Sequence, residues 1–543
     1  MPVLKGDALI SKAHDNGDGL HREVARRRTF AIISHPDAGK TTLTEKILLY
    51  AGAVDLAGAV RTRGNQQHAV SDWMTMEKQR GISISATALE MEYQGYRINL
   101  LDTPGHQDFS EDTYRTLMAV DSAVMVLDSA KGIEPQTEKL FRVCRMRGIP
   151  ILTFVNKLDH PGRDPLSLLD EIERILGITA VPMSWPIGEA PSFLGVYDLN
   201  RNQVLRFKRT AHGQYRAPVE VTGIGDPSLP AFLGEHAYQK LSEEIELLAR
   251  VNGSFDRERY LVGDMTPVFF GSALNNFGVE TFLEAILDLA PAPASRKATE
   301  GEIEPTSEVF SGFVFKVQAN IDPRHRDRMA FLRVCSGRFQ KDMTVKHPRL
   351  GQRVRLSRAY RLFARDREPI EEAFPGDVIG IVSPGLFAIG DTVTTGDMAP
   401  CAGIPRFPPE HFGVLINIDI GRYKQFHKGL RQLEEEGTVQ VFHAEDSRRR
   451  EPIVAAVGEL QFDVVLTRLS DEYGVKAQIN RLPFTCARWV QGERKVLENL
   501  SLSSHSTLRC RDRHDRLVVL YLSARHLEYC QKQNPHINFL EIG

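Results

Sequence analysis

A loop of small and polar residues joins a strand-like apolar run at 29–33 to a helical pattern at 41–50 that ends before Gly52. The spacing of its glycine, lysine and threonine matches a phosphate-binding loop, in which backbone N–H groups and a helix N-terminus hold a polyphosphate. Such a strand, loop and helix predict an α/β domain with a mixed, mostly parallel sheet and flanking helices. We expect nucleotide to contact the residues of this loop, which are Ser34, His35, Pro36, Asp37, Ala38, Gly39, Lys40, Thr41 and Thr42.

Two residues of this loop carry chemistry, and one departs from the pattern. Lys40 would reach the β- and γ-phosphates, and the hydroxyl of Thr41 would bind magnesium. Ser34 replaces the first glycine of the pattern, so the loop must turn there without glycine's access to positive φ. The alternative interpretation of the segment is a glycine turn before a helix.

A second motif follows the strand-like run 98–101 and consists of Asp102, Thr103, Pro104, Gly105 and His106. An aspartate at a strand end can reach a nucleotide-bound magnesium ion, and the amide of Gly105 can sense a terminal phosphate. His106 stands where a side chain could handle water beside that phosphate. Taken alone, the string also fits an ordinary strand-to-turn junction.

Two later motifs each follow a strand-like run. After the run 149–155 come Asn156, Lys157, Leu158 and Asp159, and after the run 267–270 come Gly271, Ser272 and Ala273. Asp159 can accept from N1–H and the exocyclic amine of guanine, Asn156 can bond the opposite edge, and Lys157 can cover the ring. The backbone amides of the later motif suit the guanine carbonyl oxygen. Adenine would leave the carboxylate unpaired, which gives discrimination of roughly 10⁴ or more. A guanine-nucleotide hydrolase is therefore predicted, and Asp159 disfavours the alternative of a phosphate-loop kinase or ATPase.

The length of 543 residues predicts three to four domains, because single cores stop growing at about 250 to 300 residues. We expect a polar N-terminal segment (1–23), a nucleotide domain (24–295) with an insertion at about 185–260, a small β-barrel domain (305–400) and a C-terminal α+β domain with an extension (410–543). Helices are expected at 279–289, 424–436 and 459–469, and strands at 312–317, 331–334, 376–382, 439–442 and 453–457. The fold class is thus multidomain α/β, and no function is predicted for the insertion.

Composition excludes several classes of protein. A hydrophobic content of 42% and a charged content of 25% are those of a soluble globular chain. No apolar run reaches the roughly 18 residues that span a bilayer, and the N-terminal segment lacks a signal-peptide core, so we expect a cytoplasmic protein with no membrane partner. Six scattered cysteines without a C-x-x-C pair predict reduced thiols.

The net charge of −2 gives no global attraction for nucleic acid and no reason to expect DNA as a partner. Binding to RNA would rest on basic stretches at 324–328, 355–367 and 448–450, which solvated, salt-bridged faces explain equally well.

Residues 80–84, Arg-Gly-Ile-Ser-Ile, resemble the first switch of translational GTPases, the ribosome-activated class that includes elongation factor G. Ser83 stands where most of that class carries threonine. The segments 34–44, 71–74, 77–83, 429–437 and 461–465 narrow the resemblance to the bacterial class II peptide-chain release factors. It runs from about Arg26 almost to the C-terminus. Elongation factor G resembles the first half equally well, but its two further C-terminal domains have no room in the about 60 residues after Pro483.

The resemblance implies a ribosome-activated GTPase of translation termination that uses GTP, GDP and Mg²⁺. Its catalytic residues would be Lys40 and His106, and its magnesium ligands would be Thr41, Ser83 and, through water, Asp102. His106 would turn inward when an RNA loop of the large ribosomal subunit captures it, past an apolar gate formed by Ile82 and Pro36. The expected partners are both ribosomal subunits and the class I release factors, which the protein would remove after peptide release. A translocation or ribosome-rescue GTPase of the elongation factor G type and a non-hydrolysing GTP-dependent scaffold are the alternatives.

Overall fold

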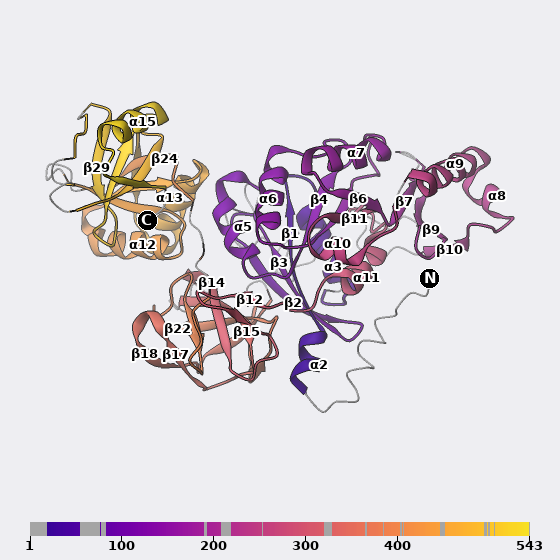
Figure 1. Cartoon of the computed structure of the whole chain (residues 1–543), viewed down its shortest axis with the longest axis horizontal. Helices are drawn as coiled ribbons and strands as arrows, with labels where there is room; N and C mark the ends of the chain where they lie inside the picture. Colours follow the sequence, from indigo (N-terminus) through magenta and orange to yellow (C-terminus); the bar gives the residue numbers. More distant parts are fainter. Residues whose placement is uncertain are drawn as a thin grey trace.

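The computed structural model describes residues 19–54, 77, 83–188, 190, 193–207, 219–251, 253–319, 328–363, 366–383, 385–401, 404, 407–445, 451–493, 497, 500–503 and 505–541. The first part of the chain forms a sheet of order β2-β3-β1-β4-β5-β11-β6 (Figure 1). Its strands are β1 (Arg27–Ser34), β2 (Thr87–Tyr93), β3 (Tyr96–Asp102), β4 (Ser122–Asp128), β5 (Ile151–Asn156), β6 (Thr179–Pro182) and β11 (Met265–Phe270). Every neighbouring pair is parallel except β2 and β3. The predicted mixed, mostly parallel sheet is confirmed.

The central strands of this sheet are buried on both faces, which explains their continuous apolar runs. Alternate residues of β1 enter two cores: Ala31 and Ile33 lie in one, and Phe30 and Ile32 in the other. The first core is covered by α5 (Ser110–Leu117), α6 (Pro135–Met146) and α7 (Pro165–Leu176), and the second by α3 (Lys40–Tyr50) and α11 (Val279–Leu289). A short helix, α2 (Gly19–Ala25), precedes β1. Among the described residues, no helix is both long and apolar enough to cross a bilayer.

The insertion has a fold of its own, which the sequence did not predict. Its antiparallel sheet consists of β7 (Ser184–Ile187), β8 (Gly195–Asp198), β9 (Gln203–Phe207) and β10 (Val219–Gly223). It continues into α8 (Leu229–Leu233), α9 (Glu235–Val251) and α10 (Arg257–Leu261). Figure 1 shows α8, α9 and the small sheet on the side of the nucleotide domain away from the rest of the chain.

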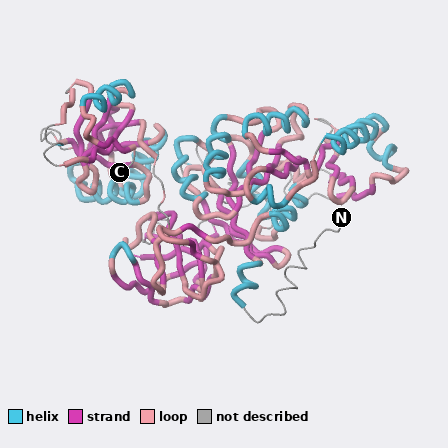
Figure 2. Tube along the Cα trace, in the orientation of Figure 1, coloured by secondary structure: helices cyan, strands magenta, loops and turns pink. Residues whose placement is uncertain are grey.

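The second unit consists mainly of strands joined by loops (Figure 2). After the hairpin of β12 (Arg296–Lys297) and β13 (Glu302–Ile303), antiparallel strands surround one apolar core. They are β14 (Ser311–Ala319), β15 (Arg328–Ser336), β16 (Phe339–Gln340), β17 (Thr344–His347), β18 (Gln352–Arg355), β19 (Ala359–Phe363), β20 (Asp366–Pro369), β21 (Glu372–Ala373), β22 (Val378–Ser383) and β23 (Thr392–Thr394), with η3 (Pro348–Leu350) after β17. Strands were predicted at the positions of β14, β15 and β22, and these are confirmed. Phe363 of β19 pairs with Leu89 of β2, so the sheets of the first two units are continuous.

The described residues of the third unit form one sheet of order β27-β24-β26-β25-β29-β30-β28-β31 with flanking helices. Its elements are β24 (His411–Asn417), η4 (Ile420–Arg422), α12 (Tyr423–Glu435), β25 (Gln440–Ala444), β26 (Ile453–Ala456), α13 (Leu460–Tyr473), β27 (Ala477–Leu482), β28 (Cys486–Gln491), β29 (Thr507–Arg511), β30 (Leu517–Tyr521), α15 (Ala524–Gln533) and β31 (Asn538–Leu540). The predicted helices and strands of its first half are confirmed. None of the six cysteines forms a disulfide in the structure.

Buried ion pairs fasten the first unit to the second. Arg27 donates to both carboxylate oxygens of Asp377, at 2.8 Å each, and Arg333 pairs with Asp121. Thr29 Oγ1 donates to the carbonyl of Gly376 at 2.7 Å. Breaking a buried pair leaves a charge without compensation, at a cost of about 3–5 kcal/mol. We therefore expect the first two units to move together. As the division of the chain into domains we propose the predicted boundaries, 24–295, 305–400 and 410–543.

Candidate functional site

The phosphate loop does not need a glycine at its first position, Ser34, because the residues with positive φ lie later in the loop. Positive φ falls on Asp37 (65°) and Gly39 (91°), whereas Ser34 is not among the described residues with positive φ. Ser34 is buried and its hydroxyl donates to the carbonyl of His35 at 2.9 Å. Aspartate tolerates the left-handed region better than most residues. The expected difficulty at Ser34 is therefore absent, because the loop does not require positive φ there.

Asn156 joins the phosphate loop to the later guanine motif. Its Nδ2 donates to the carbonyl of Ala38 at 2.8 Å, and its Oδ1 accepts from the N–H of Ala273 at 2.8 Å. A Cβ on Gly39 would overlap this amide nitrogen, so only glycine fits. One N–H of the Asn156 amide is left for a ligand, while its oxygen is already committed to protein.

A pocket of about 350 Å³ opens beside these residues, at the lower end of the size range of ligand pockets. Asp159 lines it, and Asp159 Oδ1 accepts from Ser272 Oγ at 2.6 Å. Lys157, at a φ of 67°, places its Nζ 2.9 Å from Asp128 Oδ2. Burial raises the pKa of the Asp128 carboxyl, but hydrogen bonds from Lys157 and the Ala130 amide outweigh burial and lower it overall. The pocket is thus lined by polar and apolar groups that could surround a flat polar base.

Sequence reasoning missed several residues of this pocket: Asp128, Ser129, Ala130, His160 and Leu274. Asp128 ends β4, so the rule that ligands gather at the carboxyl ends of parallel strands could have found it. Leu274 directly follows the predicted Ser272 and Ala273, and its side chain is 52% exposed. It offers an apolar surface at the mouth of the pocket.

Lys40 and Asp102 meet at the carboxyl edge of the sheet. Lys40 Nζ donates to Asp102 Oδ1 at 2.8 Å, and both side chains are buried. Asp102 Oδ2 has no hydrogen-bond partner among the described residues. Thr41 is half-buried in the first turn of α3. A buried carboxylate oxygen without a partner and a threonine hydroxyl are oxygen ligands of the kind that Mg²⁺ prefers.

Several other predicted site residues make contacts with the protein itself. Thr103 Oγ1 donates to the carbonyl of Ile32 at 2.6 Å. His35 is buried with its Nε2 3.2 Å from Glu134 Oε2, and burial lowers the pKa of its imidazole. Leu158 packs on the apolar core, and the carbonyl of Pro104 accepts from Thr113 Oγ1 at 3.1 Å. Thr42 and Gly39 both line the pocket of about 350 Å³.

His106 caps the single turn η1 (Gln107–Phe109). Its Nδ1 accepts from the N–H of Asp108 at 3.3 Å, and its side chain is 30% exposed. A neutral imidazole in this arrangement carries its proton on Nε2. Gly105 lies against the backbone of Pro36, since a Cβ there would be 3.6 Å from Pro36 Cα. Ile82, the other side of the predicted gate, lies outside the described residues, as do Arg80, Gly81 and the segment 71–74.

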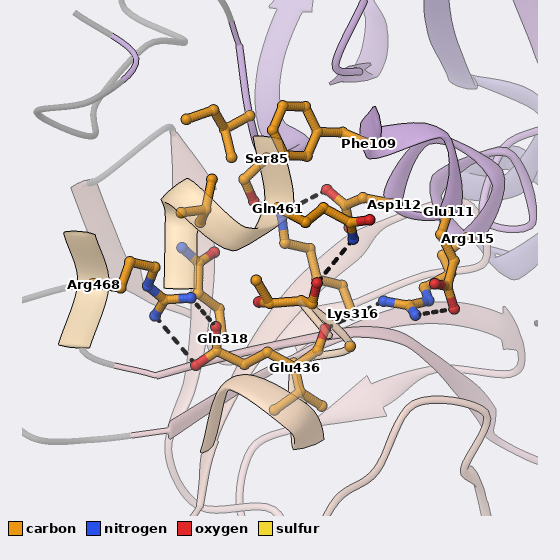
Figure 3. Close-up of a pocket in the computed structure, with 15 residues that line it drawn as sticks. Ser85, Phe109, Glu111, Asp112, Arg115, Lys316, Gln318, Glu436, Gln461 and Arg468 are labelled. Atoms are coloured by element: carbon orange, nitrogen blue, oxygen red, sulfur yellow. Dashed lines mark hydrogen bonds and ion pairs between the residues drawn. The ribbon is translucent and has the colours of Figure 1, made fainter. Parts of the chain in front are cut away.

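The segment that carries Ser83 is fastened to the second unit (Figure 3). Lys316 of β14, only 6% exposed, donates to Ser85 Oγ and to the carbonyl of Ala86. Asp112 of α5 accepts from the N–H of Ala86 at 2.7 Å and lies 3.5 Å from Lys316 Nζ. Glu77 Oε1 accepts from the N–H of Ile84 at 2.9 Å. Ser83 itself is half-buried at the end of this braced segment.

The third unit contacts the segment that follows His106. Asp108 Oδ2 accepts from the N–H of Leu460, the first residue of α13, at 2.7 Å. Glu436 Oε1 accepts from the N–H of Ala319 at 2.9 Å, and its carbonyl accepts from Arg115 at 3.2 Å. All three units therefore meet beside α5, and Figure 3 shows Arg468 paired with Glu436 at one side of this junction and Arg115 paired with Glu111 at the other. Sequence reasoning assigned no role to these contacts.

The described members of the predicted basic stretches are largely paired. Arg328 pairs with Glu435, Arg355 lies 3.2 Å from Asp342, and Arg361 lies 3.1 Å from Glu90. Residues 324–327, 364–365 and 448–450 lie outside the described part of the chain.

Comparison with known proteins gives the same order of domains. The family model "Elongation factor Tu GTP binding domain" matches residues 25–292, "Elongation factor G domain 2" matches 309–396, and "Class II release factor RF3, C-terminal domain" matches 401–531. A crystal structure of a protein from Thermus thermophilus, ttk003000868, has a similar fold, with a TM-score of 0.67 at 23% identity, over 89% of this chain and 72% of that chain.

Curated relatives match along nearly the whole chain. Peptide chain release factor 3 of Gloeobacter violaceus is 57% identical over 96% of this chain and 99% of its own length. The protein of the same name from Trichodesmium erythraeum is 53% identical over 95% of each chain, and that of Symbiobacterium thermophilum 53% identical over 96% and 98%. The chain therefore belongs to the peptide chain release factor 3 family of class II release factors and is a translational GTPase.

Proposed function

We propose that this GTPase is activated by the ribosome and removes class I release factors from it after the finished peptide has been freed. One observation carries the proposal: Lys40, the unpartnered Asp102 oxygen and a base-sized pocket share one edge of a parallel sheet, in a chain that matches release factors along its length. The relatives are named for peptide release, which supports a role in termination.

Guanine would bind in the pocket beside Asp159. Its N1–H and amine would donate to the Asp159 carboxylate, which Ser272 already orients. The remaining N–H of Asn156 would meet the opposite edge of the base, and the Ser272 and Ala273 amides would face the carbonyl oxygen. The aliphatic stem of Lys157 would cover one face of the ring, with its ammonium held by Asp128.

Lys40 would exchange its bond to Asp102 for the β- and γ-phosphates of GTP. Thr41, Ser83 and, through water, Asp102 would hold magnesium, which offsets negative charge on the phosphate oxygens. The amide of Gly105 would sense the γ-phosphate. Catalysis by these residues is positioning and electrostatic stabilisation, as in other phosphate-loop enzymes.

His106 would orient the attacking water or, as an imidazolium, stabilise the transition state. In the described conformation its Nδ1 is held by the Asp108 amide, so turning inward costs that hydrogen bond. We propose that an RNA loop of the large ribosomal subunit compensates for the loss by binding the turned imidazole.

Hydrolysis would release the two segments that contact the γ-phosphate. The first, ending at Ser83, is braced by Lys316 of the second unit, and the second is joined to α13 through Asp108. The conformational change that follows loss of the γ-phosphate would therefore be transmitted to the other two units through these contacts. A complete change of state, from 1:99 to 99:1, requires differential binding of about 5.5 kcal/mol.

Single-turnover GTP hydrolysis with purified ribosomes tests the activation step. His106→Ala should lower the ribosome-stimulated rate by about 10²-fold or more, in the range of general acid–base and positioning effects, and leave nucleotide affinity unchanged. An unchanged rate in a variant that binds GTP normally would remove His106 from the mechanism.

A further inference from the structure

The third unit carries an exposed cationic face that the proposed function does not use. Lys424, Lys428 and Arg431 of α12 follow one another at helical spacing and are all exposed. The opposite face of α12 is buried through Phe426, Leu430 and Leu433, so the three cations point to solvent together. None of these three cations makes an ion pair or side-chain hydrogen bond among the described residues.

Apolar side chains lie exposed at the N-terminal end of this face. Ile418 is 58% exposed, Ile420 85% and Tyr423 63%. Their backbone is nevertheless fixed: the N–H of Ile418 donates to the carbonyl of Lys476 at 3.0 Å, and the N–H of Arg422 donates to the carbonyl of Asp419 at 3.0 Å. Single exposed apolar residues are common, but three within six positions on a braced turn mark a surface that is presented for contact.

A tilted aromatic pair lies beside the cationic face. The ring centroids of Tyr423 and His427 are 4.2 Å apart at an interplanar angle of 60°, and Phe426 packs edge-on against His427. Because His427 already restricts the side chain of Tyr423, a ligand that binds the exposed face of the tyrosine ring would cost little further side-chain entropy. Cations that follow a backbone, with an aromatic ring among them, form the usual combination for binding nucleic acid.

We infer that Lys424, Lys428 and Arg431 bind the phosphate backbone of structured RNA in the ribosome, with Tyr423 stacked on an exposed base or sugar. This rests on the proposed function, which supplies the ribosome as partner. RNA is favoured over a protein partner because the three cations follow one another along one helix beside an exposed tyrosine ring, a combination suited to a phosphate backbone and a base. The whole chain is also slightly acidic, so attraction to phosphate must come from a local surface.

Ribosome binding by the full-length protein, with a non-hydrolysable GTP analogue, tests the inference. The variant Lys424→Glu with Arg431→Glu is compared with Arg525→Glu with Lys532→Glu in α15. The control has the same seven-residue spacing, the same change in charge and two exposed cations, on the opposite end of the third unit (Figure 1). Each variant must keep the wild-type melting temperature and GTP affinity.

We expect the α12 variant to bind ribosomes at least about tenfold more weakly at low salt, and its slope of log affinity against log salt to be smaller by about 1–2. The α15 control should stay within about twofold of wild type, as expected for a surface away from the contact. Equal affinity of the two variants would overturn the inference. If the wild-type protein itself shows no ribosome binding or stimulated hydrolysis, the proposed function fails as well.

Photocrosslinking from a photoreactive phenylalanine derivative at position 423 distinguishes an RNA partner from a protein partner. We expect ultraviolet light to join it to ribosomal RNA, in an adduct that ribonuclease shortens. Adducts confined to ribosomal proteins would contradict the RNA assignment, even if the charge variants weaken binding.

Discussion

Gly39 and Asn156 meet so closely that the phosphate loop and the guanine motifs form one unit. The amide of Asn156 fills the space in which a Gly39 side chain would lie, and its two ends hold Ala38 and Ala273. Each of these bonds contributes about 0.5–1.5 kcal/mol, and an unpaired buried partner costs more. A change at either residue therefore disturbs phosphate and base binding together.

Gly39→Ala should reduce GTP affinity by at least about tenfold, because the methyl group displaces Asn156 and strains a φ of 91°. Titration with a fluorescent guanine nucleotide measures this. Gly52→Ala is the matched control: it has a similar φ of 73°, but nothing lies within 4 Å of its Cβ position. Equal affinity losses in the two variants would mean that backbone strain, and not the Asn156 contact, limits binding.

The phosphate loop shows how far single positions could be predicted. The sequence correctly marked a loop between β1 and α3, because the apolar run and the helical pattern are local signals. It also suggested a difficulty at Ser34, which does not arise because Asp37 and Gly39 make the turn. Which side chain takes positive φ depends on the packed loop, and a pattern of residue types does not contain that information.

At the scale of elements, predictions succeeded where the signal was local. The helix predicted at 279–289 is α11 (Val279–Leu289), since Gly278 in left-handed conformation begins it and its apolar residues recur at helical spacing. The insertion escaped prediction because its strands are only four or five residues long. Lys316 sits in an ordinary strand pattern, and its contact with Ala86, 230 residues away, exists only after the units pack.

Lys316→Met should loosen the segment behind Ser83. Hydrogen bonds to charged groups contribute about 1.5–3 kcal/mol, so amide exchange at residues 84–86 should accelerate by about tenfold or more. Lys346→Met, which breaks the exposed Lys346–Asp397 pair in the same unit, should leave these amides unchanged. No change in the Lys316 variant would show that Asp112 and Glu77 alone hold the segment.

At the scale of the whole molecule, the first two units form one body and the third is attached through fewer contacts. The continuous sheet and the buried Arg27–Asp377 pair join the first two, whereas the third meets them through Asp108, Glu436 and the walls of a large cleft. Glu434 lines this cleft, and burial raises the pKa of its carboxyl to about 7. The third unit is therefore the part that we expect to shift during the GTPase cycle.

Glu434→Gln tests whether the cleft is closed in solution. The folded-state pKa lies above the ordinary value of 4.5, so the unfolded chain releases this proton first and wild-type stability falls as pH rises from about 4.5 to beyond 7. The melting temperature of the variant relative to wild type should therefore increase between pH 5 and pH 8. Glu459→Gln, at a carboxyl that is 64% exposed, should show no such trend. A flat difference for Glu434→Gln would mean that the cleft is open and the carboxyl solvated.

Release of a class I factor from the ribosome tests the central claim most directly. A labelled class I release factor is bound to purified ribosomes whose peptide has been freed, and its dissociation is followed after adding this protein with GTP. We predict dissociation several-fold faster than without the protein, and a loss of this acceleration when His106 is replaced by alanine. Dissociation at the same rate with and without the protein, under conditions in which it hydrolyses GTP on those ribosomes, would contradict the account.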